Sequence, residues 1–301
     1  MLRRLFFLTF LTLATLAAPT QPKAAGDVRG PQATDPFTSR IRGLFDYDLP
    51  ALDPPGTVKL ILHPHISDLV RRDYLRTDVG FNWALNQPWE FNAEASAFFN
   101  HGLRGKGAGS GIGEVRLGAK YVFQEWLRPD FETSAVLNIS LPVGKPPVDL
   151  TDGHDHYTPG LVIQHHSTRD PKLTNFAEAT VDIINKSSVV GFFARNQPHH
   201  DSLSFTTGAV YDLGQIKWTL AGTYTTTALI SSASDHFFSL NPSLLWYVPK
   251  RMTFNYKTQW IVGLGTRVTW GPDGRDVSVN SRLRAEITFR QVMDKMRGRS
   301  Q

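Results

Sequence analysis

Ionisable side chains recur at every second position in several stretches of this sequence, the spacing that places them on one face of a β-strand. In VSVNSRLRAEITF (residues 277–289), charged residues alternate with apolar ones. Charges of both signs on one enclosed face can form mutual ion pairs or contact a polar solute. The candidate residues for such a face are Arg76, Asp78, Glu94, Glu114, Arg116, Lys120, Glu132, Arg282, Arg284 and Glu286.

Histidines offer a second kind of chemistry, because imidazoles near a carboxylate are plausible zinc or copper ligands. The pairs are His63 with His65 on one predicted strand face, His154 with His156 around Asp155, and His199 with His200. Histidines in loops are more often only solvated, and adjacent side chains usually point apart. We therefore expect no specific metal site and no cofactor.

His165 and Ser167, in IQHHSTRD, give a third possibility. They resemble the His-x-Ser of outer-membrane phospholipase A, a twelve-stranded barrel in which the imidazole activates the serine. The Ser-Asn-Gly continuation of that enzyme is absent, since Thr168 and Arg169 follow. The predicted topology also places the pair at the periplasmic end, whereas that enzyme works at the outer face. We expect no enzyme and no catalytic residues, with lipid hydrolysis as a remote alternative.

The elements that must carry these residues are β-strands. Alternation of apolar and polar residues extends over about ten positions and repeats between turn signals, which is the strand signature. Membrane-crossing strands need about 9 to 11 residues, whereas the strands of soluble sandwiches commonly have about 5 to 6. We count twelve such segments, of which those near residues 58–65, 157–165 and 238–246 are the weaker ones.

The connections alternate between tight and long. The tight ones include NQPW, EWLRPD, DLGQ and VPKR, and the long ones include PVGKPPVDLTDGHD, KSSVVGFFARNQPHH and GLGTRVTWGPDGR. Short periplasmic turns and long external loops are typical of outer-membrane barrels. An even number of strands then places both termini in the periplasm.

The ends of the chain are predicted to lie outside the barrel. Two arginines, an apolar run of about 14 residues and a small-residue end indicate a secretory signal peptide, because that run is too short to span a bilayer. We predict a signal peptide at 1–25, a periplasmic lead-in or plug at 26–56, the barrel at 57–290 and a polar tail at 291–301. The chain has no cysteine and no basic block, which argues against disulfides and nucleic acid.

Together these patterns predict an all-β fold, a transmembrane antiparallel up-and-down β-barrel of about twelve strands in the cell outer membrane. Its apolar face contacts lipid and its polar face lines the lumen, because a closed sheet satisfies every backbone amide internally. About a dozen aromatic residues near the tight turns resemble an interfacial girdle. Closure leaves no free edge, so we expect a monomer.

Two segments resemble a known family. GIGEVRLGAKYVF (residues 111–123) and ETSAVLNISLPVGKP (132–146) are similar to the outer-membrane proteins labelled "putative MetA-pathway of phenol degradation". The shared positions are Gly111, Gly113, Glu114, Lys120, Tyr121, Leu141, Pro142 and Gly144. The sequence departs from the family at Glu114, where aspartate is frequent, and at the polar tail after Phe289. The resemblance implies a barrel and a transport role.

A twelve-stranded barrel has a backbone radius on the order of 12 Å, too narrow for a general porin. We therefore predict a channel for passive passage of a small solute, hydrophobic or aromatic solutes included. Acidic and basic residues nearly balance on the predicted inner face, which gives no strong ion preference. The alternative is a non-conducting scaffold that presents the external loops. The expected partners are outer-membrane lipid, a small-molecule solute and the barrel-assembly machinery.

Overall fold

The computed structural model describes residues 55–65, 68–71, 73–86, 88–103, 110–123, 131–143, 154–186, 200–231, 234–253, 259–272 and 274–288. The predicted signal peptide, nearly all of the predicted lead-in and the predicted tail lie outside the described residues. Most of the two longest predicted loops also lie outside the described residues, and the side chains of Arg282, Arg284 and Glu286 are not described. These assignments remain predictions.

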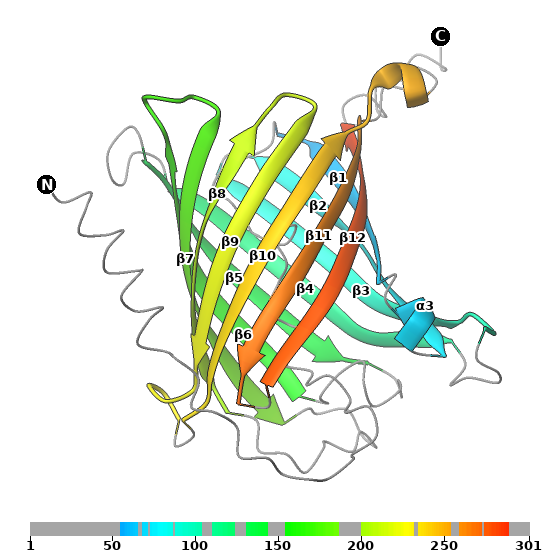
Figure 1. The fold of residues 1–301 in the computed structure, drawn as a ribbon, viewed down its shortest axis with the longest axis vertical. Helices are drawn as coiled ribbons and strands as arrows, with labels where there is room; N and C mark the ends of the chain where they lie inside the picture. Colours follow the sequence, from blue (N-terminus) through cyan, green and yellow to red (C-terminus); the bar gives the residue numbers. More distant parts are fainter. Residues whose placement is uncertain are drawn as a thin grey trace, which may run out of the picture. The chain divides into compact units, whose positions relative to one another are not determined.

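Twelve strands occur in the described residues (Figure 1). They are β1 (Thr57–Pro64), β2 (Tyr74–Asn86), β3 (Trp89–Asn100), β4 (Gly111–Phe123), β5 (Phe131–Pro142), β6 (His154–His166), β7 (Leu173–Lys186), β8 (Ser202–Asp212), β9 (Ile216–Thr226), β10 (His236–Tyr247), β11 (Gln259–Gly271) and β12 (Gly274–Thr288). The short helices α3 (Asp68–Arg71) and η2 (Lys250–Thr253) lie in connections. Most strands have 11 to 15 residues, long enough to cross a bilayer when tilted.

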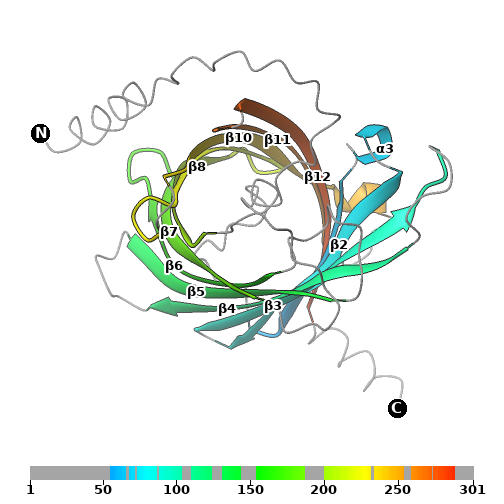
Figure 2. The same ribbon diagram turned by 90° about the horizontal axis from the view of Figure 1, so that it is seen from below.

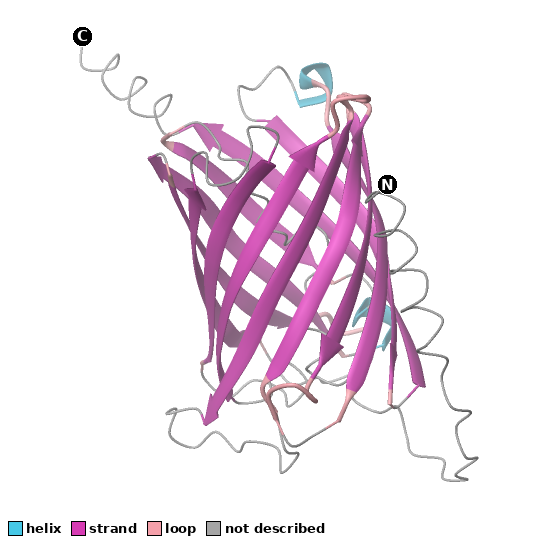
Figure 3. Ribbon diagram, turned by 90° about the vertical axis from the view of Figure 1, so that its left-hand side faces the viewer, coloured by secondary structure: helices cyan, strands magenta, loops and turns pink. Residues whose placement is uncertain are grey.

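Each strand pairs antiparallel with the next, and β1 pairs antiparallel with β12 to close the ring. The closing register runs from Thr57 opposite Thr288 to Leu62 opposite Leu283. The end-on view shows the ring of strands, and the side view shows their common tilt (Figures 2 and 3). The predicted up-and-down barrel is confirmed.

One predicted connection is wrong. The segment GLGTRVTWGPDGR is not a long loop, because β11 continues to Gly271 and β12 begins at Gly274. Gly263 and Gly265 suggested a loop, but both are buried at ladder positions of β11, opposite Arg282 and Asn280 of β12. The other connections fall into a short-connection end, where Thr57 and Thr288 also lie, and a long-loop end, where α3 lies. At the short-connection end the link from Tyr247 of β10 to Gln259 of β11 is the exception, because it is longer and contains η2.

The barrel carries its apolar side chains outside. Large apolar side chains are exposed at alternate positions of the strands, among them Leu60, Val79, Phe81, Leu117, Leu137, Phe205, Leu220, Leu264 and Val279. Buried polar side chains occupy the other parity, among them Ser96, Glu114, Asn138, Gln164, Thr206, Thr223, Ser239 and Thr269. This is the reverse of a soluble protein and fits a wall between lipid and an enclosed lumen.

Outward aromatic residues gather near the short connections. Trp83 lies opposite Phe91 across the β2–β3 pair, and the Trp89 ring lies 6.0 Å from Phe91 and 4.9 Å from Tyr121. Exposed aromatics also occur toward the long-loop end, among them Phe99, Phe205 and Trp270. Such bands suit the two interfaces of a bilayer.

Among the residues that the structure describes, no helix is long and apolar enough to span a bilayer.

Candidate functional site

The lumen wall is the candidate site, because the inward parity of the strands brings several of the predicted charged residues, among those with described side chains, onto one face of the sheet. On β4, residues Glu114, Arg116 and Lys120 follow that parity. The register of β3 against β4 places Glu94 opposite Arg116 and Glu90 opposite Lys120. Antiparallel register therefore converts alternation along single strands into pairs across neighbouring strands.

Most of these charges meet a partner of opposite sign. The Arg116 guanidinium donates to Glu114 through Nε at 2.7 Å, and its Nη1 lies 3.9 Å from Glu94 Oε2. The Lys120 ammonium lies 3.2 Å from Glu90 Oε1, with both side chains more than nine-tenths buried. Buried charges at this spacing stabilise one another only as pairs. This part of the wall is close to neutral as a whole.

Arg76 connects the wall to the long-loop end. Its Nε donates to Asp68 Oδ2 at 2.8 Å and its Nη2 donates to Asp68 Oδ1 at 3.2 Å, a bidentate geometry. Asp68 is the first residue of α3, so the ion pair fixes the short helix against β2. The sequence indicated Arg76 but not Asp68 as its partner.

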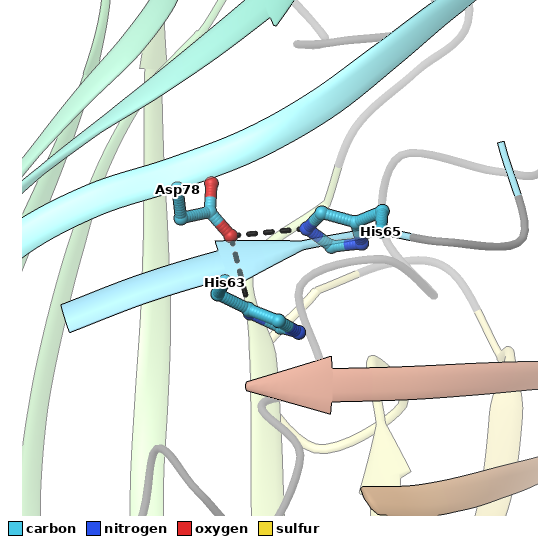
Figure 4. A group of neighbouring side chains, drawn as sticks. All are labelled: His63, His65 and Asp78. Atoms are coloured by element: carbon cyan, nitrogen blue, oxygen red, sulfur yellow. Dashed lines mark hydrogen bonds and ion pairs between the residues drawn. The ribbon is translucent and has the colours of Figure 1, made fainter. Parts of the chain in front are cut away.

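Asp78 contacts two imidazoles at the long-loop end, and these two rings stack with their centroids 4.5 Å apart (Figure 4). Its Oδ2 is 3.4 Å from His63 Nδ1 and 3.0 Å from His65 Nε2, and its Oδ1 accepts a short hydrogen bond from Ser96 Oγ. His63 and Asp78 stand opposite one another in the β1–β2 register. Sequence reasoning placed the two histidines on one face and Asp78 on the lumen wall, but it did not bring them together.

A second imidazole and carboxylate meet across β6 and β7. His156 Nδ1 lies 2.9 Å from Asp182 Oδ2, and Thr158 Oγ1 donates to Asp182 Oδ1 at 3.1 Å. Toward the short-connection end of β5, Glu132 Oε2 accepts a hydrogen bond of 2.6 Å from Gln164 Nε2. These pairs extend the polar wall as far as β7.

The three predicted wall residues of β12 are placed by the backbone alone. In the closing register Glu286 stands opposite Lys59, and Arg284 stands opposite Ile61. Arg282 stands opposite Gly263 of β11. Strand β12 therefore lies between β1 and β11 in the ladder, and the lumen-facing position of its three predicted residues stays a prediction.

The opposite part of the wall consists of hydroxyl groups, which the search for charged residues missed. The hydroxyl pairs are Ser204 with Thr225 at 2.8 Å, Thr206 with Thr223 at 2.9 Å, and Thr219 with Ser243 at 2.9 Å. They follow the inward parity of β8, β9 and β10. Alternating serine and threonine in these segments was the available signal.

Apolar side chains also occupy the inward parity. The buried ones include Ile61, Tyr74, Phe98, Val122, Val136, Val162, Phe176 and Ile261. Strict alternation predicts polar residues at such positions. The lumen wall therefore combines ion pairs, hydroxyl groups and apolar patches.

The candidate hydrolase pair lies in and beside the short connection between β6 and β7. The His165 ring packs against Phe131 at 4.8 Å, and Ser167 Oγ accepts a hydrogen bond from the Asp170 backbone N–H at 3.3 Å. The pair lies at the end that carries the short connections, as the sequence predicted.

The sequence profile of a family described as "Putative MetA-pathway of phenol degradation" matches residues 65–278. Among solved structures, the COG4313 outer membrane channel from Pseudomonas putida F1 is similar, with 10% identity over 79% of this chain and 97% of that chain and a TM-score of 0.54. The KdgM porin shares 12% identity over 76% of this chain and 96% of that chain, with a TM-score of 0.43. The NanC porin shares 10% identity over 77% of this chain and 98% of that chain, with a TM-score of 0.46. No curated protein matches the sequence.

Proposed function

This chain belongs to the outer-membrane family described as "Putative MetA-pathway of phenol degradation", and from that premise we propose that it is a channel for passive passage of a small solute. The barrel resides in the outer membrane, and its solved structural neighbours are outer-membrane channels and porins.

The observation that carries the proposal is the mixed chemistry of the wall. Ion pairs such as Lys120–Glu90 neutralise one part, hydroxyl pairs line another, and buried apolar side chains such as Val162 lie between polar positions. Paired charges produce a weak net field, so the lumen should not strongly prefer anions or cations. Hydroxyl and apolar surfaces together suit a small solute of low net charge, including an aromatic ring with polar substituents.

Conductance through planar bilayers tests the proposal. We expect discrete conductance steps from the full chain and a reversal potential near zero in a potassium chloride gradient. If neither the full chain nor a variant lacking residues 26–56 conducts, the channel proposal fails. A strongly charge-selective current would contradict the inferred neutral wall and the solute class drawn from it.

A non-conducting scaffold is the second candidate, because mutual ion pairs are also what a lining without a solute requires. The Arg116–Glu114 contact at 2.7 Å would serve such a lining equally well. Uptake by vesicles separates the two functions. Vesicles containing the protein should admit a small neutral solute faster than vesicles containing heat-denatured protein if the channel proposal holds, and at the same rate if the protein is a scaffold.

A further inference from the structure

We propose that His63, His65 and Asp78 form a binding site for a divalent transition-metal ion of the zinc type at the long-loop end of the lumen. Figure 4 shows both imidazoles directed at one carboxylate oxygen. The inference departs from the sequence-based expectation of no metal site, and it does not depend on whether the barrel conducts.

The spacing of the three groups fits metal coordination. Two ligands bound at about 2.0 to 2.1 Å with tetrahedral angles stand about 3.3 Å apart. Asp78 Oδ2 lies 3.4 Å from His63 Nδ1 and 3.0 Å from His65 Nε2, so both distances already match. The ligand atoms of all three residues lie within 4.8 Å of one another. Closing the two imidazoles on a common ion thus needs a movement on the order of one ångström.

The donor set selects the kind of metal. Two imidazole nitrogens with one carboxylate oxygen suit zinc and similar divalent ions, whereas calcium and magnesium prefer oxygen ligands alone. Three protein ligands leave at least one coordination position for water, which is the pattern of an open site. The inference therefore concerns an exchangeable ion with an accessible position, not a closed structural zinc.

Neighbouring groups hold the three ligands in place. Ser96 Oγ donates to Asp78 Oδ1, which leaves Oδ2 for the imidazoles or an ion. The His65 backbone N–H donates to the Arg76 carbonyl at 2.9 Å, and the His65 carbonyl accepts from the Asp68 N–H at 2.9 Å. Partners of this kind orient metal ligands in known sites.

A polar atom at the cluster also lacks a partner. His63 is nearly fully buried, and its Nε2 makes no hydrogen bond. A buried ring nitrogen without a partner is unfavourable in a merely structural hydrogen-bonded cluster. An ion at Nδ1 would leave Nε2 as an N–H donor, so it would offset the cost of burying this ring through the other nitrogen only.

The two guanidinium groups nearest the cluster act on it electrostatically, but each forms its ion pair with another carboxylate. Arg76 forms a bidentate pair with Asp68, and Arg116 pairs with Glu114 at 2.7 Å. Among the side chains that the structure describes, the ion-pair partners of Asp78 are the two imidazoles. An added divalent ion would therefore face one carboxylate and two imidazoles, with the two guanidinium groups paired to their own carboxylates.

Zinc titration of the full chain, folded in detergent, stripped with a chelator and free of any polyhistidine tag, tests the site. We expect the variants His63→Ala, His65→Ala and Asp78→Asn each to weaken the tightest zinc binding at least tenfold in calorimetry. His156→Ala is the matched control, because it also removes an inward imidazole paired with a carboxylate. Its zinc affinity should stay within twofold of that of the unaltered protein.

Cobalt(II) absorption supplies a second readout, since nitrogen ligands change the visible spectrum of the bound ion. The three variants should lose the cobalt band that the His156→Ala protein retains. Folding of every variant is checked by the change in gel mobility on heating. The inference is overturned if folded variants bind zinc as tightly as the unaltered protein, or if a triple variant lacking all three ligands still shows the tightest site.

Discussion

Replacing Leu220 by arginine tests which face of the wall meets hydrocarbon. Leu220 lies on β9, four residues after Ile216 and six before Thr226, and 52% of its surface is exposed. With a rise of about 3.4 Å per residue and a tilt near 40°, it lies roughly 10 Å inside the nearer strand end. In an apolar band about 25 Å tall, that position is close to the midplane.

An arginine at the midplane of a barrel destabilises it by about 2 to 4 kcal/mol, which lowers the folded-to-unfolded ratio about 30- to 700-fold. Leu213 provides the matched control, because it is the same residue with 51% exposure but lies in the connection after β8. There the same substitution should change the free energy of unfolding by about 0 to 1 kcal/mol.

The assay is reversible guanidinium unfolding of each variant in phospholipid vesicles, followed by tryptophan fluorescence. Leu220 and Leu213 are about equally exposed, so the two substitutions would destabilise the protein equally if water surrounded both positions. Equal shifts of the unfolding midpoint for Leu220→Arg and Leu213→Arg would therefore refute the assignment of the outer face to lipid. A difference of at least about 1.4 kcal/mol, a factor of ten in the equilibrium, supports it.

Three further outcomes follow from single contacts. Lys120→Met should lower the free energy of unfolding by about 3 kcal/mol in denaturant titrations, because it leaves the buried Glu90 without its ammonium partner. The double variant Lys120→Met with Glu90→Gln should recover most of this lost stability. Gly80→Ala should destabilise the barrel by about 1 to 3 kcal/mol, since the added Cβ would clash with the backbone of β3. In the control Gly222→Ala, the added Cβ would lie 3.8 Å from the nearest side chain, so this variant should unfold at the original midpoint. Ser167→Ala should leave any lipid hydrolysis by the purified protein unchanged, and a loss of measured activity would favour the hydrolase alternative.

The barrel could be predicted from sequence because lipid and lumen impose a two-residue period on every strand. Even the weakly patterned β1, β6 and β10 were located by their positions between turns. The prediction failed where glycine obscured the period, as at Gly263 and Gly265 of β11, which occupy buried ladder positions. A glycine in a strand and a glycine in a loop look alike in one sequence.

The candidate metal site could be predicted only in part. His63 and His65 share a face by simple alternation, and Asp78 shares the lumen by the same rule. Their meeting depends on the β1–β2 register, which places His63 opposite Asp78. A shift of one residue would turn every side chain of a strand to the other face, and register is set by connection geometry that a single sequence does not reveal.

The pairing of β1 with β12 has a consequence for how the molecule assembles. Every other ladder joins strands that follow one another in the chain, whereas this one joins Thr57 to Thr288. Local hairpins close short loops and can form early, but this contact must wait until both ends of the sheet are brought together, at a high entropic cost. Strand β1 is also among the shortest, with eight residues. The last ladder to form is thus short, and we expect its amide protons to exchange before those of the β6–β7 hairpin.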